Sequence, residues 1–291
     1  MTEVRLPEFS VHSTPPDGVW PRMKITNFDT WYSGGSFRSE AVESPQRDGN
    51  FDPGDVQISA KTFTLEGLLE SRTHEDLVAR DFDLLNSLQG SRSRWPLHVI
   101  DAGGDRYRTV VVDGIVDVET FHARKARFKI PFRADDPFKY GELVSRSAMI
   151  PNDVGVGLMF PLFSTKVAPA GKLDFGSIGR DGRVALPNTG NETAWPVFKV
   201  RGPAPNGFTI TNVNEGRILR YSAPVLGGQS IWINTDTGRA EVDGIADVTR
   251  SLTRYEWSGI PRGGSATFQL DAVGADMNVT LLTAETRPTW R

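Results

Sequence analysis

The sequence contains no cysteine, so disulfides, thiolate nucleophiles and cysteine-ligated zinc or iron sites are excluded. No apolar run is long enough to cross a bilayer, which predicts no membrane insertion. Residues 1–13 lack the apolar stretch of a secretory signal. The formal net charge is −3, which gives no basic footprint for nucleic-acid binding. These absences favour a soluble protein that is assembled in the cytoplasm.

Turn-forming residues are abundant by contrast, with 29 glycines and 19 prolines in 291 residues. Between Leu186 and Trp257, short stretches of alternating apolar and polar residues are interrupted by Asn-Thr-Gly, Pro-Asn-Gly, Gly-Gly and Asp-Gly. An antiparallel sandwich needs this pattern, because each strand buries one face and each reversal needs residues that tolerate positive φ. We therefore predict a β-sandwich domain over residues 183–291.

Residues 1–140 are predicted to form a β domain with one helix, an α+β arrangement within a mainly β chain. Strand-like alternation is clearest in Ala123–Arg133, where apolar and basic residues take turns. Thr73 is the predicted N-cap of the helix and Gly90 suits its C-terminus. The expected apolar stripe of the helix is Leu77, Val78, Phe82, Leu84, Leu85 and Leu88.

The segment 141–182 is polar, rich in glycine and proline, and weakly periodic, which indicates a linker that carries a few added strands. We place the domain boundary near residue 140. No internal repeat or low-complexity tract is present in the sequence.

Residues able to do chemistry are scattered. The four histidines, His12, His74, His98 and His122, have no metal-ligand or triad spacing, so an incidental role is favoured over a site. Asp135-Asp136 resembles a carboxylate pair, but its place before a proline favours a turn. The cluster at 124–127 is better explained by a solvated strand face than by a phosphate patch. We predict no catalytic residue, no cofactor and no metal, and therefore no enzyme.

Tryptophans leave one alternative open. The sequence has seven, and three of them, Trp195, Trp232 and Trp257, fall in the predicted sandwich. They are interpreted as core or interface anchors, with a sugar-stacking platform as the second interpretation.

Three segments together resemble the distal tail proteins of long-tailed phages. They are Arg47-Asp48-Gly49 followed by Ser59–Gly67 and a helix, the strand RFKIPFRADDPFKYG, and Asn188–Phe198 followed by Gly227–Gly238. Each segment is a short strand-turn pattern. Their order and spacing, from about residue 47 to 263, carry the resemblance.

The resemblance implies a tail-tube-like barrel or sheet that forms a hexameric ring, with a galectin-like sandwich projecting outward. Such a virion protein at the tail tip would contact the tail-tube protein, the tape-measure protein, tail-tip or tail-associated proteins and receptor-binding proteins. It would meet DNA only in transit through the lumen of the ring.

A long aromatic loop is the candidate site for contacts between subunits. It is expected from Ser33 to Asp55, and its length and composition single out Trp31, Tyr32, Phe37 and Phe51 at or near it. Two other functions stay open: a carbohydrate-binding tail adhesin that grips cell-wall glycan through its sandwich, and a cell-wall hydrolase. The scattered histidines and the lack of a paired-acid constellation argue against the hydrolase.

Overall fold

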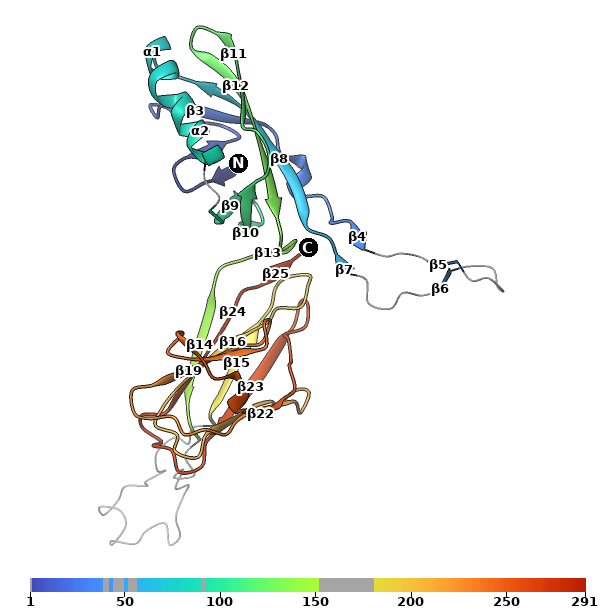
Figure 1. Cartoon of the computed structure of the whole chain (residues 1–291), viewed down its shortest axis with the longest axis vertical. Coiled ribbons are helices and arrows are strands. Elements are labelled where there is room, and N and C mark those ends of the chain that lie inside the picture. The colour runs from blue at the N-terminus through green and yellow to red at the C-terminus, as the bar shows by residue number, and fades with distance from the viewer. Residues whose placement is uncertain (1, 39–41, 44–49, 52–56, 91–92, 152–180) are drawn as a thin grey trace, which may run out of the picture. The chain divides into compact units, whose positions relative to one another are not determined.

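The computed structural model describes residues 2–38, 42–43, 50–51, 57–90, 93–151 and 181–291, and the chain divides into two compact units (Figure 1). The first unit comprises Met1–Glu142 together with Trp290–Arg291, and the second comprises Leu143–Thr289. Strand β14 (Val144–Met149), which falls within the predicted linker, is a strand of the second unit. The chain is mainly β with one packed helix, as the sequence predicts.

The first unit is built on a closed β-barrel. Its strands are hydrogen-bonded in the order β11-β12-β8-β3-β2-β1-β9-β10-β13-β25, and a further pairing between β10 and β12 closes the barrel. The strands are β1 (Glu3–Arg5), β2 (Ser10–His12), β3 (Arg22–Asn27), β8 (Lys61–Glu70), β9 (Trp95–Asp101), β10 (Gly104–Val112), β11 (Asp117–His122), β12 (Lys125–Ala134), β13 (Lys139–Tyr140) and β25 (Thr289–Trp290).

The central ladder of the barrel pairs β8 with β12, from Lys61 opposite Ala134 to Glu70 opposite Lys125. Alternate side chains of both strands are buried, because successive residues of a strand point to opposite faces. The inward set forms the barrel core together with residues of β1, β9 and the helix. The outward set includes cross-strand ion pairs, such as Lys129–Glu66 at 3.1 Å.

The helix packs against the barrel (Figure 1) and has three parts: α1 (His74–Asp76), a π-helical turn (Leu77–Asp81) and α2 (Phe82–Gly90). The predicted cap is confirmed, because the Thr73 hydroxyl accepts a hydrogen bond from the amide of Asp76 at 3.0 Å. The predicted apolar stripe is wrong at Val78, which is 53% exposed. A π turn holds more residues than an α turn, so it shifts the buried face of the helix at this point.

The expected loop between Ser33 and Asp55 contains paired backbone. Strand β4 (Phe37–Arg38) pairs antiparallel with β7 (Gln57–Ile58), and β5 (Val42–Glu43) pairs antiparallel with β6 (Asn50–Phe51). Both ladders are separate from the barrel sheet. We call this segment, residues 37–58, the arm. It was predicted as a loop because alternating polar and glycine-rich residues give little apolar periodicity.

The second unit is a β-sandwich. One sheet has the order β14-β24-β16-β19-β20-β21 and the other has the order β15-β23-β17-β18-β22. Their inner faces share one core, in which Phe198 and Phe268 meet edge to face at 4.8 Å. The strands besides β14 are β15 (Arg183–Pro187), β16 (Val197–Arg201), β17 (Phe208–Asn212), β18 (Ile218–Tyr221), β19 (Ser230–Asn234), β20 (Arg239–Val242), β21 (Ala246–Asp247), β22 (Leu252–Tyr255), β23 (Ser265–Asp271) and β24 (Leu281–Thr286).

Buried Asn188 organises the turn that follows β15. Its amide nitrogen donates to the carbonyl oxygens of Glu192 at 2.7 Å and Ile260 at 3.2 Å. Its amide oxygen accepts from the backbone N–H groups of Gly190 at 3.0 Å and Thr289 at 3.3 Å. A Cβ atom at Gly190 would lie 1.9 Å from the carbonyl oxygen of Thr289, so only glycine fits there. The Asn-Thr-Gly sequence is thus a structural link between the turn and the end of the chain.

We predict that Asn188→Ala lowers the free energy of unfolding of the second unit by about 2–3 kcal/mol, because it leaves buried backbone groups without partners. Urea denaturation of the whole chain measures the effect. Asn278→Ala, at an exposed position of the same unit, is the control and should change stability by less than about 0.5 kcal/mol. Equal effects of the two substitutions would contradict the structural role of Asn188.

Candidate functional site

The four residues singled out for subunit contacts lie in different environments. Trp31 is only 1% exposed, and its ring stacks on Phe28 at 5.7 Å and meets the edge of Phe63 at 5.6 Å. It is therefore a core residue of the first unit, and its indole is not on the surface where the prediction put it. The physical reason is that the chain turns inward through a short 3-10 helix at Asp29–Trp31 before the arm begins.

Tyr32 is 52% exposed, and its hydroxyl donates to the carboxylate of Asp101 at 2.9 Å. It stays a candidate for contact with a neighbouring chain. The backbone of Phe37 pairs with Ile58, and that of Phe51 pairs with Val42. The side chains of Phe37 and Phe51 lie outside the part of the chain that the structure describes, so their predicted role stays a prediction.

Three buried cations lie close together, and two of them lie near the ring of Trp31. Lys61, Arg108 and Lys139 are 5%, 1% and 6% exposed, and they come from the start of β8, the middle of β10 and the start of β13. The guanidinium of Arg108 lies 4.7 Å from the Trp31 ring centre and the ammonium of Lys139 lies 6.0 Å from it. We call these three residues the cation cluster. It lies at the root of the arm, because Lys61 follows β7 closely in the chain.

Backbone carbonyls and the hydroxyl of Ser33, rather than carboxylates, receive the hydrogen bonds of the cation cluster. Arg108 donates to the oxygens of Pro137 at 3.1 Å and Trp31 at 3.3 Å, and Lys61 donates to the oxygen of Ser33. None of the three forms an ion pair with a described residue. Buried charges are normally paired, so this arrangement is costly for the isolated chain.

The two nearest carboxylates have other partners. Asp136 accepts from the amide of Phe138 at 3.0 Å and from the hydroxyl of Tyr140 at 2.5 Å. Asp101 accepts from Tyr32 and from the amide of Gly103, the latter at 2.7 Å. Each offers the cation cluster a nearby negative charge without a direct bond.

The burial of these cations shifts their titration. The pKa of Lys139 is lowered to about 8, mainly by burial and also by the charges of Arg108, Lys61 and Arg106, while the charge of Asp101 opposes the shift. Burial also lowers the pKa of Lys61 to about 8, with Arg108 contributing. The pKa of Arg108 falls to about 10, again through burial, although Asp136 opposes the shift.

The cation cluster was not found from the sequence, although a signal was present. Lys61 lies two and four residues before the buried Phe63 and Leu65 of β8, so it faces the same side of the strand. Arg108 lies two residues before the buried Val110 of β10 and also faces inward. A charged residue at an inward position of a strand is the pattern to look for, because polar groups rarely face a core without a reason. The positions are far apart in the chain, so only the barrel brings them together.

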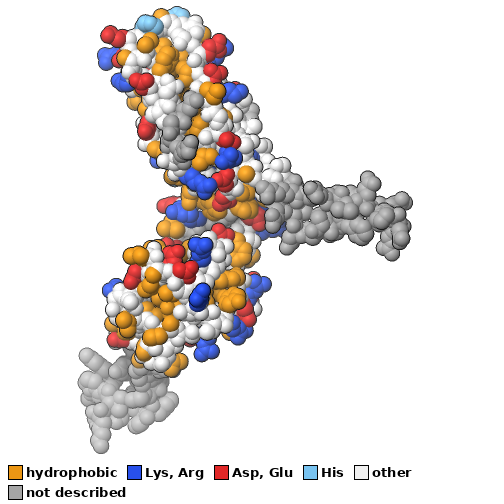
Figure 2. All heavy atoms as spheres, in the orientation of Figure 1, with side chains coloured by type: hydrophobic (Ala, Val, Ile, Leu, Met, Phe, Trp, Pro, Cys, Tyr) orange, Lys and Arg blue, Asp and Glu red, His pale blue; other side chains and the backbone are white. Residues whose placement is uncertain are grey.

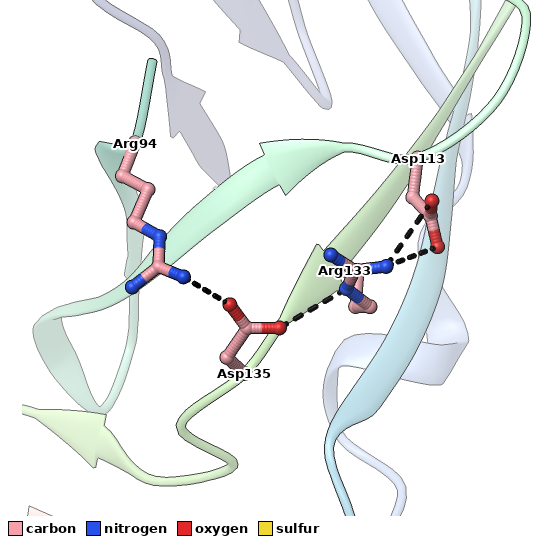
Figure 3. A network of polar contacts seen from close by, with 4 residues as sticks. All are labelled: Arg94, Asp113, Arg133 and Asp135. Atoms are coloured by element: carbon pink, nitrogen blue, oxygen red, sulfur yellow. Dashed lines mark hydrogen bonds and ion pairs between the residues drawn. The ribbon is translucent and has the colours of Figure 1, made fainter. Parts of the chain in front are cut away.

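Asp135 and Asp136 do not form a catalytic pair. Asp135 bridges Arg94 at 2.6 Å and Arg133 at 3.0 Å, and Arg133 also reaches Asp113 at 3.4 Å (Figure 3). Asp136 holds the turn before β13 through the bond to Phe138. The prediction of a turn at this position is confirmed, and the network ties the ends of neighbouring strands together.

The histidines are engaged singly where their bonds are described. His98 contacts Asp105 at 2.9 Å and His74 contacts the carbonyl oxygen of Ala123 at 2.6 Å. Within the described ranges, no group of three or more histidine or acidic side chains is placed to hold a metal ion. None of the helices in those ranges combines the length and apolar character that a bilayer span requires.

Trp232 marks a pocket of about 430 Å³ on the sandwich. Its ring is 38% exposed, and the ammonium of Lys199 lies 4.2 Å from the ring centre while bonding to Glu285 at 3.0 Å. Lys199 thus occupies one face of the indole. Trp257 is packed against the sandwich core, as an anchor residue would be, and Trp195 is exposed.

We predict that the free energy of unfolding of the first unit rises between pH 8 and 10.5. Over this window Lys61 and Lys139 have lost protons in the folded state, whereas in the unfolded state they keep them up to their ordinary pKa of 10.5. Unfolding then takes up protons, so raising the pH stabilises the folded state. Urea denaturation at pH 7.5 and 9.5 measures this at low protein concentration.

The control for this prediction is the double variant Lys61→Met, Lys139→Met. It keeps the length of both side chains and should lose most of the pH dependence that the wild type shows over this window. An unchanged pH dependence in the double variant would assign the effect to other groups.

Comparison with known proteins gives structural relatives only. No protein-family model and no curated protein sequence matches the chain. The structure resembles that of the SPP1 Dit (gp 19.1) protein, described as a paradigm of the hub adsorption apparatus in Gram-positive infecting phages, with a TM-score of 0.63 and 10% identity. This match covers 92% of the present chain and 94% of the SPP1 chain.

A second similar structure is a chain of the phage P2 baseplate in its activated conformation with calcium. Its TM-score is 0.51 at 12% identity, and the match covers 100% of the present chain and 98% of the baseplate chain. Both matches extend over the barrel and the sandwich. The chain therefore has the Dit-type fold of phage tail hub proteins, and it shares this fold with the SPP1 protein across both of its units.

Proposed function

We propose that this protein is a distal tail protein of a long-tailed phage, a virion component that forms a ring at the tail tip. The first unit joins the ring to the tail tube, and the second unit carries tip and host-adhesion proteins. The single observation that carries this proposal is the fold match to the SPP1 hub protein over 92% of the chain, because the match includes both units.

The barrel has features that suit a ring. A closed ring needs two different, complementary surfaces on each subunit. Strand β11 ends the strand order of the barrel sheet and is exposed along nearly its whole length, so it offers a free edge. The arm offers a second surface, since its two ladders lie outside the barrel sheet. One subunit's arm against the next subunit's barrel is the arrangement that we propose.

The surface charge suits passage of DNA through the ring. Figure 2 shows acidic and basic side chains interspersed on the face in view, without an extended region of one sign. Several of the basic residues are paired, as in Lys125–Glu70 at 3.2 Å and Arg22–Asp17 at 2.9 Å. A strongly basic wall would bind phosphates and slow the passage of DNA, so a balanced surface is favourable.

A non-enzymatic role follows from the same chemistry. Asp135 forms ion pairs with Arg94 and Arg133, and Asp136 accepts a hydrogen bond within its turn. Neither carboxylate is therefore placed as a general acid or base. Near the cation cluster, Asp101 and Asp136 likewise accept hydrogen bonds from tyrosine hydroxyls and backbone amides. The ring would act by holding partners in place.

The pocket at Trp232 is the one observation that favours an adhesin. Its lining includes Asn234, Arg239 and Glu241, side chains that can bond to sugar hydroxyls, next to a partly exposed indole. Against this, Lys199 covers one face of the indole, and a sugar would have to displace it to stack there. We therefore keep the ring as the main proposal, and a glycan array with Trp232→Ala as control tests the alternative.

The ring predicts a defined mass. Six copies of the 32.1 kDa chain amount to about 193 kDa, which light scattering on a chromatographic peak resolves from a monomer. Negative-stain images of the same peak should show annular particles. A monomer at every concentration tested, up to about 10 mg/ml, would count against a ring that closes without the tail tube.

The arm is expected to be needed for ring formation. Ser59 donates its backbone N–H to the carbonyl of Ser36 at 2.9 Å, so the arm can be replaced by a two-residue Asn-Gly turn between these residues. We predict that this variant keeps the melting temperature of the barrel within a few degrees and elutes as a monomer. A ring that persists without the arm would contradict its role. A deletion of equal length within residues 155–177 of the second unit is the control.

A further inference from the structure

The cation cluster lacks the negative partner that its burial calls for. Two of its three cations, Arg108 and Lys139, lie near the ring of Trp31, and Lys139 has neither a hydrogen bond nor an ion pair to any residue in the described ranges. A single buried cation without a partner is rare, because the loss of hydration is not offset. The like charges also repel, because Arg108 lowers the pKa of both lysines and Lys61 lowers the pKa of Lys139.

A fourth cation, Arg106, independently indicates that a negative partner is missing. The Nε atom of Arg106 is buried without a hydrogen-bond partner among the described residues, while its guanidinium lies 4.3 Å from the ring centre of Trp290. Both residues belong to the first unit. Arg106 is close enough to Lys139 to lower its pKa. The positive charge around the cation cluster is therefore larger than the three residues alone provide.

The two described carboxylates that act on this site, Asp101 and Asp136, form no direct bond to it. The oxygens of Asp101 and Asp136 already accept hydrogen bonds from Tyr32, Gly103, Phe138 and Tyr140. Moving either carboxylate onto a lysine would break those bonds and free the turn that each one holds. A negative group from outside the subunit is the cheaper solution, because it adds bonds without breaking any.

A neighbouring copy of the chain is a suitable source of that group. The cation cluster lies at the root of the arm, where we propose that subunits meet, and the sequence of the arm has five acidic residues against two arginines. We propose that the cation cluster binds an aspartate or glutamate side chain of the adjacent subunit when the ring closes. This inference rests on the proposed ring.

The interaction would make ring closure and charge compensation one event. Each subunit would carry an uncompensated positive site until its neighbour arrives, and the carboxylate would then form charge-assisted hydrogen bonds in a site shielded from water. The isolated subunit would be less stable with the cations than without them. The ring would be more stable with the cations. A purely structural role would instead make the cations stabilise the isolated subunit as well.

The first test compares Lys61→Met and Lys139→Met with the wild type. Each substitution removes the charge and keeps most of the aliphatic stem. We expect the monomer to melt at the wild-type temperature or above, and the concentration at which half of the rings dissociate to rise at least tenfold. Lys24→Met, at an exposed position of β3, is the matched control and should leave both quantities unchanged. Variants that form rings at wild-type concentrations would overturn the proposal.

Failure of the ring itself would look different. If the wild type and Lys24→Met are monomeric at every concentration, the proposed ring is wrong and the inter-subunit role of the cation cluster is wrong with it. If the wild type forms rings and only the cluster variants are unaffected, the ring stands and the role of the cluster is wrong. A lower melting temperature of the cluster monomers, with intact rings, would assign the lysines a structural role only.

The second test identifies the partner. Rings assembled from a mixture of ¹⁴N- and ¹⁵N-labelled chains are treated with a water-soluble carbodiimide, which joins a lysine amine to a carboxylate in contact with it. The lowered pKa of Lys61 and Lys139 favours this reaction, since the neutral amine is the nucleophile. Mass spectrometry should find Lys61 or Lys139 linked to an acidic residue of the other isotope. Links to Asp101 or Asp136 of the same chain alone would overturn the proposal.

A small free anion could supply the negative charge in place of a neighbouring subunit's carboxylate. If it is the ligand, sulfate will raise the melting temperature of the wild-type monomer more than chloride does at equal ionic strength. Lys139→Met will lose that effect, and no link between isotopes will form. This combination would assign the site to a small anion and overturn the role of the neighbouring subunit.

Discussion

The pairing of β8 with β12 is the interaction on which the first unit depends. It runs without a break from Lys61 opposite Ala134 to Glu70 opposite Lys125, so one register decides which face of both strands is buried. That register sends phenylalanines and leucines inward and puts ion pairs such as Glu66–Lys129 outside. It also sends Lys61 inward, at the end of the ladder where the apolar core stops. The cation cluster is thus a consequence of the same alternation that builds the core.

The second unit uses a different means to fix its long connections. Asn188 replaces missing backbone pairing by bonding to the turn at Gly190 and to Thr289 near the end of the chain. Its neighbour Gly190 permits an approach that no side chain would allow. The bond to Thr289 joins residues 101 positions apart, so it fixes the segment that follows β24 within the second unit.

Much of the fold was predictable from local pattern. The cap at Thr73, the turn at Asp135-Asp136 and the inward alternation of β12 follow from residue types and spacing that act within a few positions. The burial of Val78 and Trp31 was harder to predict. A π turn places Val78 at the surface, and a short 3-10 helix places Trp31 in the core. The arm was missed as paired backbone because its strands are only two residues long and carry little apolar periodicity.

The sequence by itself determined that this is a mainly β protein without disulfides, and its strand-turn segments pointed to the phage tail proteins whose fold it shares. Only the tertiary structure decided which charged residues would lose their water. Within its own strand, the inward position of Lys61 or Arg108 does not show which groups that residue will meet. The barrel sheet contains β8, β10 and β13, and its closure through β10 and β12 brings their charges together, with Arg108 and Lys139 near the ring of Trp31. Contacts between segments so distant in the chain are set by the closure of the sheet, which no local pattern encodes.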